Sequence, residues 1–337
     1  MGRDLVICCD GTWNDAPRAE QSERSNVWRF YELAIGAPGE TKQYFHGVGT
    51  RDLKDWLRGG LWGFGIGKAI REAFGWLAQH YIPGDRIFLI GFSRGAFTAR
   101  SLAGMIGYRG LNPYLGKLDE QQLEKAVARE YDAYRARIRT TEPVPSIHFV
   151  GVFDTVGKLG VPNQRKIANL FDRPKAWAFH DTQLGAHVTH GRHAIAIDES
   201  RAEFMPTLWV SSKGEPIYDF AANGRSVKQF WFCGQHSDVG GANRPVANMA
   251  LSWMLQEAQS CGLAVDKKSA RGTRAKFARA ALADPARALR IYAARRPAAY
   301  ALQQRSCCSS QRAGASQAGW GILASSLAAS RGGDLHG

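Results

Sequence analysis

The stretch that decides the fold is Arg86-Ile87-Phe88-Leu89-Ile90-Gly91-Phe92-Ser93-Arg94-Gly95-Ala96-Phe97. Its first half is the most hydrophobic run in the chain, and its length is typical of a strand that is buried on both faces. The segment after Gly95 has helical spacing, so the two glycines mark a tight turn from strand to helix. Such a strand and helix form the repeating unit of a parallel sheet.

The rest of the chain continues this alternation as far as about residue 265. Short apolar runs predict further strands over 5–9, 43–48, 147–153 and 227–233. Helical spacing predicts helices over 26–35, 61–81, 95–107, 118–138, 184–196 and 248–261, with Ser25 or Asn26 as the first N-cap. We therefore expect an α/β fold with a mainly parallel sheet and helices on both faces.

Composition changes near Val265, which predicts one folded domain over 1–265 and a weakly folded or disordered tail over 266–337. The tail is rich in Ala and Arg, and it holds 13 Lys and Arg against 3 Asp and Glu within a chain of net charge +14. A basic tail can attract anionic lipid or nucleic acid. Because its basic residues are not interleaved with aromatic ones, we expect no nucleic-acid partner.

The remaining composition excludes several classes of protein. No run approaches 18 consecutive apolar residues and the N-terminus has no room for a signal peptide, so we expect a cytoplasmic location, with signal-less export left open. The six cysteines have neither the spacing of a zinc site nor that of a disulfide framework.

Ser93 occupies the centre of a G-x-S-x-G pattern between a strand and a helix, which makes it a candidate nucleophile. The turn is so tight that larger side chains at Gly91 and Gly95 would collide with neighbouring elements. It raises the serine hydroxyl to the start of a helix, where the helix dipole and N–H groups favour an oxyanion. The N–H of Arg94 is the expected first oxyanion donor. The alternative is a glycine-rich turn with an incidental serine.

A carboxylate and an imidazole follow later strands in the order that this turn requires. Asp154 comes directly after strand 147–153, at the sheet edge where open α/β sheets carry their sites. His236 lies in a glycine-rich loop after strand 227–233, and an imidazole suits general-base work near neutral pH. We predict a Ser93-Asp154-His236 triad, with Asp238 bracing the turn. The alternatives are an Asp154 that caps a turn and a His236 on the surface.

The loop Asp10-Gly11-Thr12 follows the first strand and has two interpretations. If that strand lies beside the Ser93 strand, the N–H of Gly11 or Thr12 supplies the second oxyanion donor. Asp10 alternatively braces the loop by accepting a hydrogen bond from its own backbone. Both interpretations can hold together.

Two further patterns do not support a cofactor or a metal. Gly63-Phe64-Gly65-Ile66-Gly67-Lys68 lacks the third glycine of a dinucleotide site and the Ser or Thr of a P-loop, so its glycines are interpreted as easing a helix start or close packing. The histidines at 180, 187, 190 and 193 lack the spacing of a metal hydrolase.

Segment 156–180 combines basic and apolar residues, and it is either a lid that meets an anionic head group or an ordinary surface excursion.

The motifs Cys9-Asp10-Gly11-Thr12-Trp13-Asn14, Gly91-Phe92-Ser93-Arg94-Gly95-Ala96, Val152-Phe153-Asp154-Thr155-Val156-Gly157 and His236-Ser237-Asp238-Val239-Gly240-Gly241 occur together. In combination they resemble the α/β-hydrolase domain family DUF2235, which is related to the type VI secretion phospholipase effectors. The segments 180–182 and 193–199 also resemble this family. The resemblance spans residues 3–262 and implies a Ser-Asp-His hydrolase of lipid or other carboxylic esters, whereas the tail departs from it.

Three hypotheses follow from the sequence. The first is a serine ester hydrolase that uses Ser93, Asp154 and His236 through an acyl-enzyme, with a small-molecule or lipid ester as substrate and transient contact with a membrane surface. The second is a non-catalytic binding or scaffold module that retains the same fold. The third is a metal-dependent hydrolase built on the histidines between residues 180 and 193.

Overall fold

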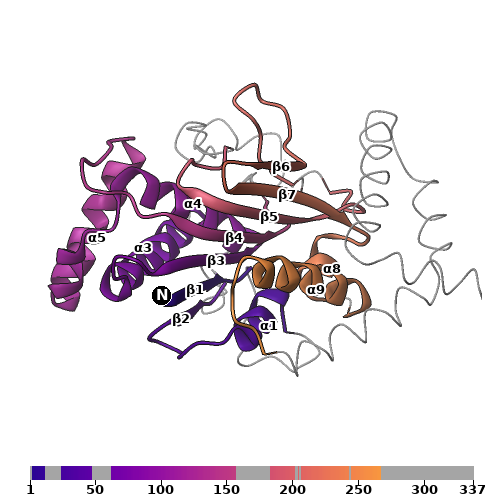
Figure 1. Ribbon diagram of the computed structural model, residues 1–337, viewed down its shortest axis with the longest axis horizontal. Coiled ribbons are helices and arrows are strands. Elements are labelled where there is room, and N and C mark those ends of the chain that lie inside the picture. The colour runs from indigo at the N-terminus through magenta and orange to yellow at the C-terminus, as the bar shows by residue number, and fades with distance from the viewer. Residues whose placement is uncertain are drawn as a thin grey trace, which may run out of the picture. The chain divides into compact units, whose positions relative to one another are not determined.

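The structure is a computed structural model of the chain, and it describes residues 2–11, 24–47, 62–156, 183–201, 204, 206–242 and 244–266. Within them, seven strands form one sheet in the order β2-β1-β3-β4-β5-β7-β6 (Figure 1). The strands are β1 (Asp4–Cys9), β2 (Lys42–Phe45), β3 (Arg86–Phe92), β4 (Ile147–Phe153), β5 (Val188–Ala196), β6 (Asp219–Ala222) and β7 (Arg225–Phe232). All neighbouring strands pair in parallel except β6 and β7. The sheet is mainly parallel, as predicted.

Helices cover both faces of this sheet (Figure 1). One face carries α3 (Trp62–His80), α4 (Arg94–Arg109) and α5 (Glu120–Arg135), with the 3-10 turn η1 (Pro113–Lys117) beside α3. The other face carries α1 (Asn26–Leu33), α8 (His236–Gly240) and α9 (Arg244–Ser260). The described residues lie in one compact unit, and they have the α/β architecture with helices on both faces of the sheet that the sequence predicts.

Alternate residues of the central strands belong to two separate cores. Ile87 and Leu89 pack with α3, α4 and α5, whereas Phe88 and Ile90 pack with α1 and α9. All four side chains are fully buried. A strand that is buried on both faces reads as a continuous apolar run, which is why β3 stood out in the sequence. This burial fixes the carboxyl end of β3, and with it the turn at Ser93.

Local signals set the helix ends and the glycine positions. Ser25 is the N-cap of α1, and its hydroxyl accepts the N–H of Trp28 at 3.1 Å. Gly63, Gly65 and Gly67 lie within α3. A side chain at Gly67 would come within 3.0 Å of the Tyr131 hydroxyl on α5, which supports the close-packing interpretation of this motif. No helix within the described ranges is long and apolar enough to cross a bilayer.

The expected helix over 184–196 is wrong, because most of this segment is strand β5. Residues of β5 pair with β4 on one side and with β7 on the other, and Gly191 packs against Trp209. Because both faces of β5 are covered, it has no alternating pattern to mark it as a strand. His187 precedes this strand, and His190 and His193 are part of it, so none of the three lies on a helix.

The hairpin of β6 and β7 also differs from expectation, since only the second of its strands was predicted. Asn223 and Gly224 connect the strands, and both have positive φ, at 52° and 74°. Two positive φ values are typical of a type I′ turn, for which Asn-Gly is the preferred sequence. The dipeptide was therefore a usable signal for β6.

Candidate active site

The turn at Ser93 has the strained backbone that its sequence pattern predicts. Ser93 has φ 56° and ψ −118°, and α4 begins at the next residue, Arg94. A Cβ at Gly91 would lie 2.5 Å from the Gly95 carbonyl oxygen, and one at Gly95 would lie 2.0 Å from the Cys9 carbonyl oxygen. Since real Cβ atoms do not approach so closely, both positions require glycine. A non-glycine residue in this conformation costs about 1–3 kcal/mol, which the surrounding packing must offset.

The structure brings Ser93, Asp154 and His236 together from three separate strand ends. His236 Nε2 lies 2.8 Å from Ser93 Oγ, and His236 Nδ1 lies 2.6 Å from Asp154 Oδ2. Asp154 is fully buried, and the other two residues are less than a tenth exposed. Because β3, β4, β5 and β7 are adjacent and parallel, their carboxyl ends meet at one edge of the sheet. The distances form a continuous hydrogen-bonded path from carboxylate to hydroxyl.

Asp154 is held at the end of β4 by both its backbone and its side chain. Its N–H donates to the Ala194 carbonyl at 2.7 Å, and its Oδ1 accepts the N–H of Ala196 at 2.9 Å. It has a positive φ of 40°, as Ser93 does. The N–H of Ser93 donates to the carbonyl of Phe153, directly before Asp154, at 3.1 Å. The two strained residues are thus tied together by neighbouring strands.

His193 supports the backbone next to Asp154. Its Nε2 accepts the N–H of Thr155 at 3.1 Å, so Nδ1 carries the ring proton and donates to Gln229 Oε1 at 3.1 Å. Burial, with the nearby Arg100, lowers the pKa of His193 to about 3, so the ring is neutral near pH 7. His193 is thus a buried, hydrogen-bonded histidine with a structural role.

His236 is the first residue of α8 and not part of a loop as predicted, and the turn before it is braced by Asp238 as expected. Asp238 Oδ2 accepts the N–H of Gln235 at 2.7 Å, which places Asp238 in a capping box at the start of α8. The Phe92 ring packs 4.7 Å from the imidazole, between ring centroids. A Cβ at Gly240 would lie 2.0 Å from the Phe92 ring, so the loop closes tightly over this aromatic residue.

Asp10 adopts the bracing role that was one of its two interpretations. Its Oδ1 accepts the N–H of Gly11 at 2.6 Å, so that N–H is already hydrogen-bonded. Its Oδ2 accepts the hydroxyls of Ser25 and of Tyr44, the latter at 2.6 Å. This geometry does not favour Gly11 as an oxyanion donor. Thr12 lies outside the described residues, and Arg94 remains the predicted first donor.

Sequence reasoning missed Glu199, which contacts the His236 loop. The Glu199 side chain is 2% exposed, and its Oε2 accepts the N–H of His236 at 3.2 Å. Its position just past the carboxyl end of β5 is the signal that could have found it. That signal was hidden because the strand before Glu199 was predicted as a helix.

The other candidate sites contribute less to this arrangement. Segment 156–180, apart from Val156, and His180 lie outside the described residues. Within the described part of the chain, no group of three His, Cys, Asp or Glu side chains could hold a metal ion. His187 Nε2 donates to the Ala103 carbonyl at 2.8 Å, and His190 Nδ1 is hydrogen-bonded to the Ser226 hydroxyl at 2.9 Å.

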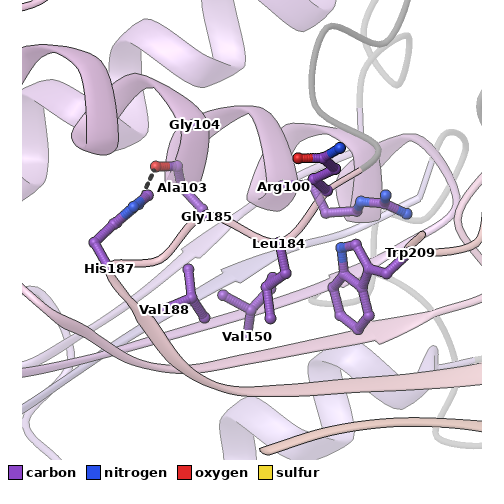
Figure 2. A pocket seen from close by; sticks show the side chains of 10 residues that line it. Arg100, Ala103, Gly104, Val150, Leu184, Gly185, His187, Val188 and Trp209 are labelled. Carbon is purple, nitrogen blue, oxygen red and sulfur yellow. Dashed lines mark hydrogen bonds between the residues drawn. The ribbon is translucent and has the colours of Figure 1, made fainter. Parts of the chain in front are cut away.

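Figure 2 shows a small pocket beneath α4. Its lining is mostly apolar, with Trp209, Leu184 and Val150 on one side and Arg100 reaching in from the helix. It includes none of Ser93, Asp154 and His236. We interpret it as a gap in the packing between α4 and the sheet.

Comparison with known proteins adds a family to this geometry. The uncharacterized Saccharomyces cerevisiae protein YEL023C is 29% identical over 237 residues, which cover 60% of this chain and 32% of the yeast protein. A structure of the Tle1 effector bound to the VgrG spike from the Type 6 secretion system matches with a TM-score of 0.41 and 21% identity, over 72% of this chain and 52% of that one. An uncharacterized protein from Pseudomonas aeruginosa matches with a TM-score of 0.45 and 17% identity, over 82% of this chain and 48% of that one.

The chain thus spans about a third of the yeast relative and about half of each of these two structures. The family model described as "T6SS, Phospholipase effector Tle1-like, catalytic domain" matches residues 3–257, which is most of the chain. This protein therefore belongs to the Tle1-like catalytic-domain family of type VI secretion phospholipase effectors.

Proposed function

We propose that this chain is a serine hydrolase that cleaves carboxylic esters of lipid or phospholipid type through an acyl-enzyme at Ser93. The observation that carries the proposal is the hydrogen-bonded path from Asp154 through the His236 imidazole to Ser93, with distances of 2.6 and 2.8 Å. Membership of a phospholipase effector family supports a lipid ester as the substrate class.

In the first half of this reaction Ser93 Oγ attacks the ester carbonyl carbon while His236 Nε2 takes the hydroxyl proton. The carbonyl oxygen becomes an oxyanion, which the N–H of Arg94 and the dipole of α4 would stabilise. When the tetrahedral intermediate collapses, the imidazolium gives its proton to the departing alcohol, and the acyl group stays on Ser93. Asp154 holds the Nδ1–H tautomer and stabilises the imidazolium.

In the second half, His236 activates a water molecule, which attacks the acyl carbonyl and releases a carboxylic acid. The bond between the acyl group and Ser93 Oγ breaks, and Oγ recovers its proton from the imidazolium. The chain needs no cofactor for these steps. The proposed partners are therefore a lipid or small-molecule ester and, transiently, the surface of the membrane that contains it.

A fluorophosphonate probe tests the nucleophile directly, because it forms a covalent bond with an activated serine hydroxyl. We expect the folded protein to be labelled and Ser93→Ala to be unlabelled. Ser146→Ala is a matched control, since Ser146 is exposed and precedes β4, at the opposite edge of the sheet. Failure of the folded parent protein to react would overturn the proposed nucleophile.

Substrate assays separate an enzyme from a binding or scaffold module. Hydrolysis of aryl esters of increasing acyl length and of phospholipid vesicles should be measured for the parent protein, Ser93→Ala and Ser146→Ala. We expect activity in the first and third proteins alone, unchanged by a chelator. Turnover that survives Ser93→Ala, or that a chelator abolishes, would contradict the proposal.

A further inference from the structure

The segment after β5 is fastened to the loop that carries His236. The N–H of Ile197 donates to the Phe232 carbonyl at 3.0 Å, and the N–H of Asp198 donates to the Gly234 carbonyl at 3.0 Å. The N–H of Gly234 donates in return to Asp198 Oδ2 at 2.6 Å. These bonds extend the pairing of β5 and β7 beyond the strand ends, and they lead the chain directly to Glu199.

Glu199 and Arg201 form an ion pair next to His236. Arg201 Nε and Nη2 donate to the two Glu199 oxygens at 2.8 and 2.7 Å, and the Arg201 N–H donates to Oε1 at 2.9 Å. The N–H of His236 also donates to this carboxylate, at 3.2 Å. Burial alone would raise the pKa of Glu199, but these hydrogen bonds hold it at about 2. Glu199 therefore carries a full negative charge at neutral pH.

The same segment also contacts the imidazole ring. The centroid of the Phe204 ring lies 4.9 Å from that of His236, and the Arg201 guanidinium lies 4.0 Å over Phe204. The N–H of Phe204 donates to the Arg201 carbonyl at 3.0 Å. The carboxylate of Glu199 and the ring of Phe204 thus both contact His236, and the Arg201 guanidinium contacts both of these side chains.

We propose that Glu199 and Arg201 are positioning residues for His236, and that the positive charge of Arg201 balances the negative charge of Glu199 next to this residue. This inference rests on the proposed function, because it assigns His236 the work of a general base. Glu199 fixes the backbone of the base, and Phe204 limits the movement of its ring. Arg201 holds the Glu199 carboxylate in a two-bond ion pair.

The charge balance predicts shifts of opposite sign when one partner is neutralised. Loss of the Arg201 charge leaves an extra carboxylate near the ring, which favours the imidazolium and moves its titration to higher pH. Loss of the Glu199 charge leaves an extra cation and moves the titration to lower pH. The Arg201 side chain is half exposed, so solvent screens part of the effect, and we expect shifts of roughly half a pH unit.

Other charged groups on the elements around this loop stay constant in such a comparison. They are Asp154 after β4, Asp198 after β5, Asp238 in α8, Arg94 at the start of α4, Arg29 in α1, and Arg244 at the start of α9. Because none of these groups is changed in the variants, a difference in the titration midpoint between variants is due to the Glu199 and Arg201 charges.

The experiment compares Arg201→Gln, Glu199→Gln and the double variant with the parent protein. The acid limb of the pH profile of kcat/KM for a soluble aryl ester gives the titration of the free enzyme. We expect its midpoint to rise in Arg201→Gln, to fall in Glu199→Gln and to return to the parent value in the double variant. A role limited to folding would lower the plateau of every variant and leave the midpoint in place, and that result would overturn the inference.

Titration of the His236 imidazole by NMR gives the same information without substrate. The resonance is assigned with His236→Gln, and circular dichroism confirms that each variant is folded. If the parent protein neither labels nor turns over, the proposed function fails, whereas the NMR midpoints still test the charge pair. Midpoints that do not move in opposite directions, or that the double variant does not restore, overturn the charge pairing even if the parent protein is active.

Discussion

Two buried carboxylates flank the strand of the candidate nucleophile, and they have different partners. Asp10 follows β1 on one side of β3, and Asp154 follows β4 on the other side. The oxygens of Asp10 accept one backbone N–H and the hydroxyls of Ser25 and Tyr44. Those of Asp154 accept one backbone N–H and the ring nitrogen of His236. The side chain of Asp10 is thus hydrogen-bonded to hydroxyl groups, and that of Asp154 is hydrogen-bonded to an imidazole.

This difference separates structural from chemical use of the same local pattern. Hydroxyl groups do not gain or lose a proton near neutral pH, so these contacts of Asp10 hold the β1 loop, the start of α1 and β2 together. An imidazole can become charged, so the contact of Asp154 can control where a proton resides. The partner that the fold supplies, and not the strand-end aspartate itself, decides the role.

The largest expected difference between the two carboxylates is in turnover. In Asp154→Asn the amide would donate to His236 Nδ1 and force the ring proton onto Nε2, which then could not accept the proton of Ser93. We expect kcat/KM to fall by roughly 10³–10⁴-fold with little change in stability. The matched variant is Asp10→Asn, for which we expect activity within about tenfold of the parent protein. Equal losses in both variants would abolish the distinction.

The sequence was sufficient to predict the three site residues that follow strands with a recognisable apolar pattern. Ser93 and Asp154 come after continuous apolar runs that are buried on both faces. His236 comes after β7, which begins with polar residues and ends in the apolar run Phe230-Trp231-Phe232. Because parallel strands align their carboxyl ends, the meeting of these side chains follows from topology. The α/β architecture was predicted for the same reason.

The supporting residues were harder to predict because their signals depend on tertiary contacts. His193 and Glu199 belong to or follow β5, whose residues mix histidine, glycine and arginine and show no strand alternation. Burial between β4 and β7 overrides this weak local preference. The partners of Asp10 lie 15 and 34 residues away in sequence, so no spacing rule connects them.

Low pH should destabilise the fold through His193, which supports the backbone next to Asp154. The folded pKa of about 3 lies below the ordinary value of 6.5, so the unfolded chain binds a proton that the folded chain excludes. The stabilisation is complete above pH 6.5 and is lost as the pH falls toward 3, by about 2 kcal/mol between pH 6.5 and 5. His193→Gln cannot titrate, so urea unfolding should show a shallower acid dependence in this variant. Parallel pH curves would show that His193 is not held neutral.

The smallest expected effect concerns Asp10, and it tests whether the hydrogen bonds of this residue contribute to stability and not to turnover. Tyr44→Phe removes the hydroxyl that donates to Asp10 Oδ2 at 2.6 Å, while the bonds from Gly11 and Ser25 remain. Loss of a hydrogen bond to a carboxylate should lower the free energy of unfolding by about 1.5 kcal/mol. Tyr31→Phe, in the same aromatic cluster, is the matched control. Ester turnover should stay within about twofold in both variants, since neither hydroxyl can move a proton to Ser93. A large loss of turnover in Tyr44→Phe alone would mean that the Asp10 network takes part in the chemistry after all.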